Sequence, residues 1–275
     1  MTTNQHRIRA RLPFWACTLI AVVLMFANYI GLVPLQFAAK AVQPDPTPGQ
    51  DRVVNILACL MTLATSLVLV ALASRWVLGR RLGEVGWRVS RDSWWLFGLG
   101  WAAAAAVGLG AQALACVPGL PIETFSTASE RAGMTGSVLA LVLLAKVAQA
   151  IALQGIPEEL VWRGWLMNCL QDRPRLALVV SAVVFGALHV VSNGGMHGIE
   201  AITYPLQAMA FAFLAGALAL RMRPLWCAIG VHAGLQPHQP RTGLRPAECR
   251  WFARVGHPGG RVRHARIACP ARVAG

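Results

Sequence analysis

The sequence predicts an all-α fold: a polytopic transmembrane helical bundle of about seven spans, with a cytoplasmic N-terminus. Hydrophobic residues make up 56% of the 275 residues and charged residues only 13%, against roughly 25% charged in soluble domains. Several apolar runs approach or exceed the roughly 20 residues that a helix needs to cross a bilayer. These runs do not alternate apolar and polar residues as barrel strands do, so we expect helices.

Seven apolar segments are the candidate spans, and the arginines between them predict their orientation. We expect membrane helices over 13–37, 53–73, 94–117, 134–156, 175–190, 199–220 and 224–236. Positive residues concentrate in short cytoplasmic loops. Three arginines precede the first span and five lie between residues 74 and 92, so both segments are expected inside. The expected location is an integral, multi-pass position, in the bacterial plasma membrane.

The net charge of +14 does not predict a nucleic-acid partner. Residues 237–275 hold eight arginines and one acidic residue, so half of the excess charge lies there. No basic face alternates with stacking aromatic residues, as a nucleic-acid interface would. The seven cysteines show no C-x-x-C spacing, and five lie in or beside apolar segments. We therefore expect neither a disulfide framework nor a structural zinc site.

We expect three regions along the chain: N-terminal transmembrane helices over 1–136, a membrane core over 137–236 that carries the candidate functional residues, and a disordered tail over 237–275. Proline and glycine supply ten of the 39 residues of the tail, close to the composition of low-complexity sequence. Our hypothesis is that a frameshift replaced the native C-terminus. An apolar stretch in another reading frame just downstream would support it, and its absence would reject it.

Ionisable residues within the apolar segments are the candidate functional residues, because a charge in hydrocarbon is costly. Glu159 and Arg163 are four residues apart and share a helix face, so we expect a structural ion pair. Glu158 lies about 100° round the helix and is paired less directly. An unpaired carboxylate suits a general base. The alternative is an ordinary helix start with an acidic first turn. Pro157 is expected to kink this segment.

Two further motifs place polar groups on apolar helices. Phe185 and His189 are four residues apart, as are His232 and Gln236. Glu158 lies 16 residues before Pro174 and His189 lies 15 after it. A helical hairpin that turns there would bring both to the same depth, about 22–24 Å from the turn. By the same rise, His232 would lie only about 12 Å from its helix start, which is shallower.

Three motifs, in their order along the chain, resemble those of the CPBP (CAAX-processing and bacteriocin-processing, or Abi) family of intramembrane endopeptidases. The motifs are Glu158-Glu159-x-x-x-Arg163, Phe185-x-x-x-His189 and His232-x-x-x-Gln236. The resemblance implies that Glu158, helped by His189, activates a water molecule. It also implies that His232 and Gln236 stabilise the oxyanion, with Glu159, Arg163 and Phe185 in support. The implied partners are the lipid bilayer and a membrane-associated protein or peptide substrate, either CAAX-like and prenylated or a leader peptide.

Several alternatives stay open at this point. Two histidines and a carboxylate also suit zinc, so Glu158, His189 and His232 are its ligands if a metal is used; otherwise no cofactor is expected. Gln236 stands where the family usually has Asn and is followed by Pro237, so this member is an enzyme whose activity the C-terminus could impair. A non-catalytic binding or bacteriocin self-immunity protein is the alternative function. Lys146 either neutralises a carboxylate or extends to the membrane surface.

Overall fold

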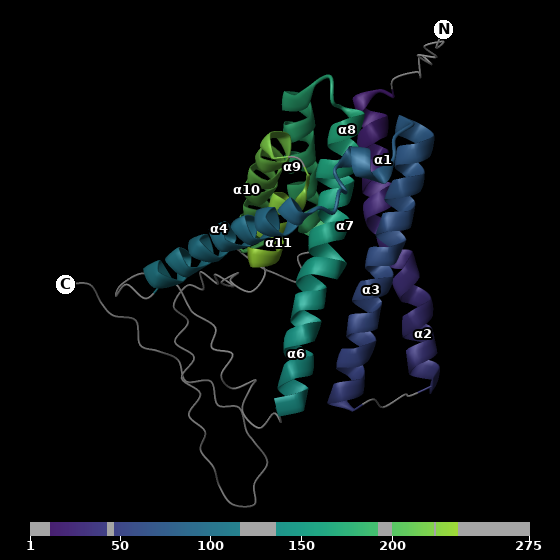
Figure 1. The fold of residues 1–275 in the computed structure, drawn as a ribbon, viewed down its shortest axis with the longest axis vertical. Helices are drawn as coiled ribbons and strands as arrows, with labels where there is room; N and C mark the ends of the chain where they lie inside the picture. Colours follow the sequence, from purple (N-terminus) through teal and green to yellow (C-terminus); the bar gives the residue numbers. More distant parts are fainter. Residues whose placement is uncertain (1–11, 43–46, 116–135, 192–199, 223, 236–275) are drawn as a thin grey trace, which may run out of the picture.

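The protein is a bundle of membrane helices. The computed structural model describes residues 12–42, 47–115, 136–191, 200–222 and 224–235, and the regular structure there is helical throughout (Figure 1). Six helices are long and apolar enough to cross a membrane, and Trp226–Leu235 is a shorter apolar helix. The predicted all-α bundle of about seven spans is confirmed. The cytoplasmic N-terminus and the three-region division stay predictions, and residues 237–275 lie outside the described part.

The first two spans pack side by side through a close contact in mid-span. The first span consists of α1 (Phe14–Ala27), a 3-10 turn (Asn28–Gly31) and α2 (Leu32–Val42). The second is α3 (Pro48–Ala73), which continues as a π-helical turn to Leu78. Gly31 lies against the Thr65 side chain of α3, where a Cβ atom would overlap it. The absence of a side chain at residue 31 therefore lets the 3-10 turn approach α3.

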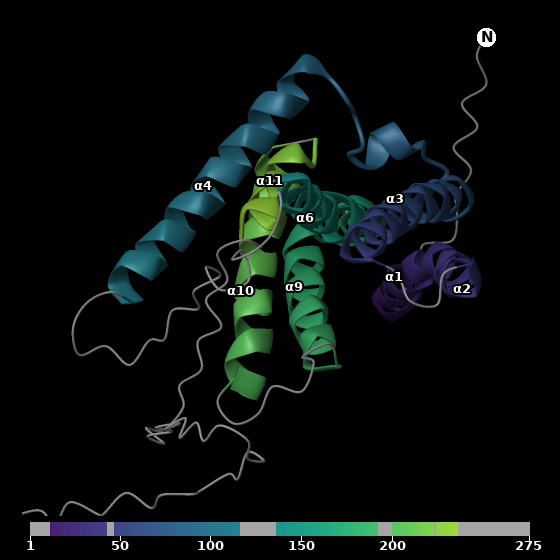
Figure 2. The same cartoon turned by 90° about the horizontal axis from the view of Figure 1, so that it is seen from below.

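The third span, α4 (Arg91–Ala115), leans away from the other long helices and packs mainly on α11 (Trp226–Leu235) (Figures 1 and 2). Glycines make this contact possible. A Cβ atom on Gly100 would overlap the Cys227 carbonyl, and one on Gly230 would overlap the Phe97 carbonyl. Small residues commonly bring membrane helices this close, because packing rather than the hydrophobic effect holds them together.

Gly230→Ala is expected to lower stability by about 1–3 kcal/mol, the usual cost of overpacking a tight contact. Gly98→Ala on α4 is the matched control, because a Cβ atom added there would meet no atom within 4 Å. Alanine favours a helix over glycine by about 1 kcal/mol, so the control should be neutral or stabilising. Thermal unfolding in detergent measures both changes. A stability loss in both variants, or in neither, would contradict the packing account.

The fourth helical run, Gly136–Cys169, is the central one and is longer than predicted. The sequence suggested an end at residue 156, but α6 (Gly136–Ala148), α7 (Ile156–Glu159) and α8 (Met167–Cys169) form one continuous rod. Two π-helical segments, Gln149–Gly155 and Leu160–Leu166, join the three helices. Pro157 has no N–H to donate, and the π-helical turn before it carries the helix past this break.

The turn predicted between the first two motifs follows α8, where the chain leaves the central rod. The chain turns after α8 and enters α9 (Pro174–Val191), which packs along α10 (Glu200–Arg221). The main buried cluster lies where these helices meet the central rod, and Trp162 and Trp165 are its largest fully buried side chains. The motif residues thus lie on helices that surround the most tightly buried part of the bundle.

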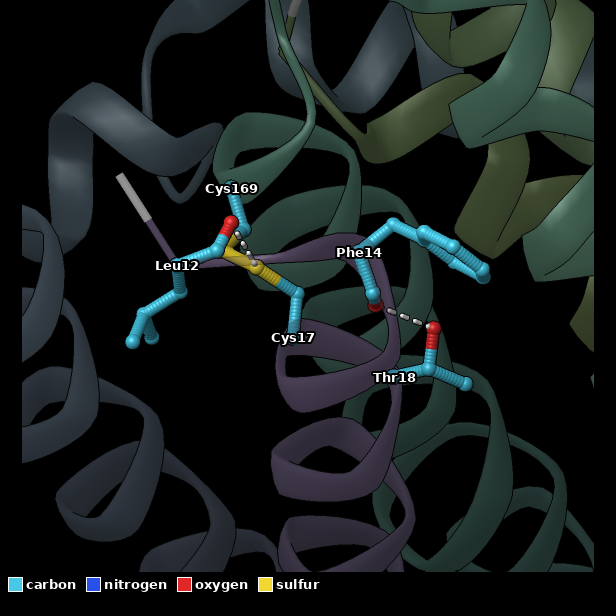
Figure 3. The surroundings of a disulfide bond; sticks show 5 residues. All are labelled: Leu12, Phe14, Cys17, Thr18 and Cys169. Carbon is cyan, nitrogen blue, oxygen red and sulfur yellow. Dashed lines mark hydrogen bonds between the residues drawn. A yellow bond between two sulfur atoms is a disulfide. The ribbon is translucent and has the colours of Figure 1, made fainter.

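One disulfide corrects the expectation from cysteine spacing. Cys17 at the start of α1 is bonded to Cys169 at the end of α8, with 6.3 Å between their Cα atoms (Figure 3). The two residues are 152 positions apart in sequence. Spacing rules for cysteine motifs are local, so they could not predict a bond formed by packing of the first span against the central rod. Cys59 and Cys227 are buried free thiols.

Replacing both bonded cysteines by serine is expected to lower stability by about 2–4 kcal/mol. The bond joins distant parts of the chain, so its loss enlarges the unfolded ensemble. Cys59→Ser is the control, because Cys59 is buried and forms no disulfide. Its thiol donates a hydrogen bond to the Asn55 side chain of the same helix. Unfolding with and without reductant gives the comparison. A reductant effect of equal size in the double variant would contradict this prediction.

Candidate active site

The candidate site begins with two buried carboxylates and an arginine on the central rod. Glu158 and Glu159 end α7, and Arg163 follows one turn later in the π-helical segment. Arg163 donates from Nη1 to Glu159 Oε1 at 3.0 Å, the pair that their spacing predicts. Its Nη2 donates to the Ala212 carbonyl of α10 at 3.1 Å. The guanidinium therefore balances Glu159 and ties the rod to α10.

His232 on α11 faces both carboxylates. Its Nδ1 lies 3.1 Å from Glu159 Oε1, and its Nε2 lies 3.7 Å from Glu158 Oε2. A hydrogen bond from Nδ1 to Glu159 would fix the ring and leave Nε2 directed at Glu158. His232 of the third motif, 73 residues further along the chain than Glu159, thus joins the first motif at one site.

The start of α11 explains why His232 reaches this depth, which the sequence placed too shallow. The Leu225 N–H donates to the Gly86 carbonyl at 3.2 Å, and the Leu225 side chain lies beside Gly164 of the rod. The helix therefore begins inside the bundle, at the level of Gly164. Gly164 lies six residues, or about 9 Å, beyond Glu158 along the rod. Seven residues of helix from Leu225 then bring His232 back to the carboxylates.

Aromatic rings enclose the site on its other side. Phe185 of α9 and Phe211 of α10 lie against the Arg163 guanidinium, 5.0 and 5.6 Å from ring centre to Cζ. Phe211 also meets the His232 ring edge-on, with centroids 4.9 Å apart. These contacts orient a cation and an imidazole without adding charge. Phe211 was not predicted, because a phenylalanine in an apolar membrane helix carries no signal of its own.

His189 lies beside this aromatic group. Its Nδ1 is 2.8 Å from the Phe185 carbonyl, and its ring is 4.6 Å from the Phe185 ring and 5.4 Å from that of Tyr204. Phe185 in turn lies 6.4 Å from the His232 ring. The second motif therefore reaches the site through Phe185. Tyr204 is a further neighbour that the sequence did not single out.

Gln236 and Lys146 are the two remaining residues that the sequence singled out. Gln236 lies outside the described residues, so its place relative to His232 stays a prediction. Lys146 is exposed on α6, twelve residues before Glu158, which is about 18 Å along a helix. At that distance along the rod it does not pair with either carboxylate, and its extension to a membrane surface stays a prediction.

The donor set does not fit the zinc alternative. Within the described part of the chain, no three His, Cys, Asp or Glu side chains gather as a metal-binding group. Glu158, His189 and His232 would have to converge, but they do not form such a group, and the His189 ring lies against the Phe185 ring, 4.6 Å between centroids.

The two carboxylates of the site, Glu158 and Glu159, have different partners. Glu159 is fully buried, and its Oε1 contacts both Arg163 and His232, whereas the charged partner of Glu158 is His232, whose Nε2 lies 3.7 Å from Oε2. The Oε2 atom of each carboxylate has no hydrogen-bond partner among the described residues. A buried carboxylate oxygen normally has a hydrogen-bond partner, and a bound water is the usual one where protein groups are absent. Glu158, which lacks the arginine partner of Glu159, is therefore the less constrained of the two carboxylates.

Residues 132–236 match the family model of the Rce1-like type II CAAX prenyl endopeptidases. The matched segment contains the three motifs and ends at Gln236, so the resemblance read from those motifs is confirmed. No curated protein and no solved structure gives a match to this chain.

Proposed function

Since residues 132–236 match the Rce1-like type II CAAX prenyl endopeptidase family, we propose that this protein is an intramembrane endopeptidase. It hydrolyses a peptide bond in a membrane-associated substrate, either CAAX-like and prenylated or a leader peptide. Its proposed location is the bacterial plasma membrane. The observation that carries the proposal is His232 facing the Glu158–Glu159 pair from a separate helix, at 3.7 and 3.1 Å.

In the proposed reaction, Glu158 takes a proton from a water molecule as the water oxygen bonds to the scissile carbonyl carbon. His189 assists this step, and His232, with a proton on Nε2, donates to the carbonyl oxygen as it gains negative charge. The carbon–nitrogen bond then breaks, and the proton held by Glu158 passes to the leaving nitrogen. Preorganised donors are effective in such a site, because water does not compete with them. Glu159 and Arg163 keep His232 in position.

Gln236 is proposed to complete the oxyanion site with its side-chain amide. Its extra methylene relative to Asn and the following Pro237 are departures that favour a second candidate, a non-catalytic binding or self-immunity protein. The two candidates differ in their need for Glu158. A cellular phenotype that survives Glu158→Gln would support the binding role.

Proteoliposomes that contain the full chain test the proposed substrate class. Three peptides would be compared: a farnesylated CAAX reporter, the same peptide without the prenyl group, and a leader-type peptide. The proposal predicts cleavage of the first or the third, with little cleavage of the second. Cleavage of none by the unmodified chain, together with cleavage by a Gln236→Asn chain with an apolar C-terminal extension, would identify an impaired family member. Silence from both would reject the endopeptidase proposal.

A further inference from the structure

The first two spans lie outside the matched family segment, yet they bury polar side chains that no contact accounts for. Asn28, in the 3-10 turn between α1 and α2, is only 1% exposed, and Ser66 on α3 is 0% exposed. Neither side chain has a hydrogen-bond partner among the described residues. Leaving an amide unpaired in a membrane interior is costly. Such groups are normally satisfied by a bound water or a ligand.

The disulfide fixes the level of Asn28 relative to Glu158. α1 and the central rod run in opposite directions from the Cys17–Cys169 bond. Asn28 is eleven residues after Cys17, and Glu158 is eleven residues before Cys169. The two residues therefore lie at the same depth.

The buried face of α1 points Asn28 toward the rod. Cys17, Ala21 and Leu24 are buried and belong to the same core cluster as Leu160 and Trp162. Asn28 continues this stripe at the helical spacing of four, three and four residues. Tyr29, the next residue, is close enough to Glu158 to interact with its charge. Asn28 thus extends a face that contacts the rod, at the level of Glu158.

Ser66 reaches the same level from α3. Gly49 of α3 contacts Leu141 of α6, and these helices run in the same direction. Ser66 and Glu158 are each seventeen residues further along. α3 also contacts α7 and the 3-10 turn of the first span. Ser66 is therefore on a buried face between the two elements that carry Asn28 and Glu158.

We propose that Asn28 and Ser66 bind the water molecule that Glu158 activates. A buried water usually makes about three hydrogen bonds, and the Asn28 amide, the Ser66 hydroxyl and Glu158 Oε2 supply three groups with open capacity. The N-terminal spans then position the nucleophile, while α9 and α11 supply His189 and His232. The kinetic part of this inference rests on the proposed function.

The kinetic test uses Asn28→Leu, which keeps the size of the side chain and removes the amide, and Ser66→Ala. In proteoliposomes with a cleavable reporter, each should lower kcat, Asn28→Leu by about 100-fold as expected when a reactant loses its position. KM should change less than about threefold, because the water is not part of substrate binding. Leu24→Ala, one turn earlier on the same face, should lower the unfolding temperature and leave kcat unchanged. Cleavage by Asn28→Leu at the unmodified rate would overturn the proposal.

A second measurement does not need a substrate. If Asn28 and Glu158 share a water, the unfolding-temperature shifts of Asn28→Leu and Glu158→Gln should not add in the double variant, because residues in one hydrogen-bond network couple. Additive shifts would overturn the shared water even if peptide cleavage is observed. Non-additive shifts in a chain that cleaves no reporter would support the water site and reject the proposed activity instead.

Discussion

Glu158→Gln is expected to abolish detectable cleavage while the protein stays folded. Glutamine has the shape of glutamate and can still face His232, but it cannot accept a proton from water. Loss of a general base lowers kcat by about 10²- to 10⁴-fold. The measurement is the initial rate of reporter cleavage in proteoliposomes, with the unfolding temperature of the same preparation. Unchanged cleavage by Glu158→Gln would remove this residue from the mechanism.

Glu159→Gln is the matched control, because it makes the same chemical change at the adjacent position. Glu159 accepts from Arg163 at 3.0 Å and lies 3.1 Å from His232 Nδ1. Its neutralisation leaves the guanidinium without its main counter-charge. Glu159→Gln is therefore expected to lower the unfolding temperature more than Glu158→Gln. The same loss of stability in both variants would contradict the division of roles between the two carboxylates.

Arg163→Leu is expected to have the largest effect on stability, about 3–5 kcal/mol, because it breaks a buried ion pair and leaves one charge uncompensated. Arg163 is 2% exposed. Its guanidinium also donates to the Ala212 carbonyl and lies against Phe185 and Phe211. Lysine cannot reproduce the planar stacking or the paired donors, so Arg163→Lys should recover only part of the loss.

A double variant separates the ion pair from the packing of Arg163. In Glu159→Gln with Arg163→Leu, no uncompensated carboxylate remains at residue 159, so much of the stability lost in Arg163→Leu should return. The free energy of unfolding in detergent, measured for both single variants and the double variant, gives the coupling. A double variant as unstable as the sum of the single variants would show that the pair contributes little.

The sequence predicts the fold class and the local part of the site well, for a simple physical reason. Hydrophobic length determines which segments cross a membrane, and four-residue spacing determines which side chains share a helix face. The Glu159–Arg163 pair and the turn before Pro174 follow from these two rules. The convergence of Glu158 with His232 does not follow from these rules, because the helix rise placed His232 too shallow; only the family resemblance implied that the two residues act together.

The remaining features depend on packing between distant segments. The Cys17–Cys169 bond requires the first span to lie against the rod, and no local pattern shows this. The depth of His232 depends on where α11 begins. A backbone hydrogen bond from Leu225 to Gly86 fixes that start. Asn28 reads as an isolated polar residue in an apolar run. That Asn28 and Glu158 lie at the same depth follows only from the disulfide, which aligns the two helices.

The most direct test of the central claim is the mass of a farnesylated CAAX reporter after incubation with the unmodified chain and with Glu158→Gln in matched proteoliposomes. The CAAX motif carries its prenyl group on the cysteine, so cleavage after that residue removes the last three residues. We predict this loss with the unmodified chain and an intact reporter with Glu158→Gln. The same loss with both proteins, or an intact reporter with the unmodified chain, would contradict a CAAX endopeptidase that uses Glu158 as its base.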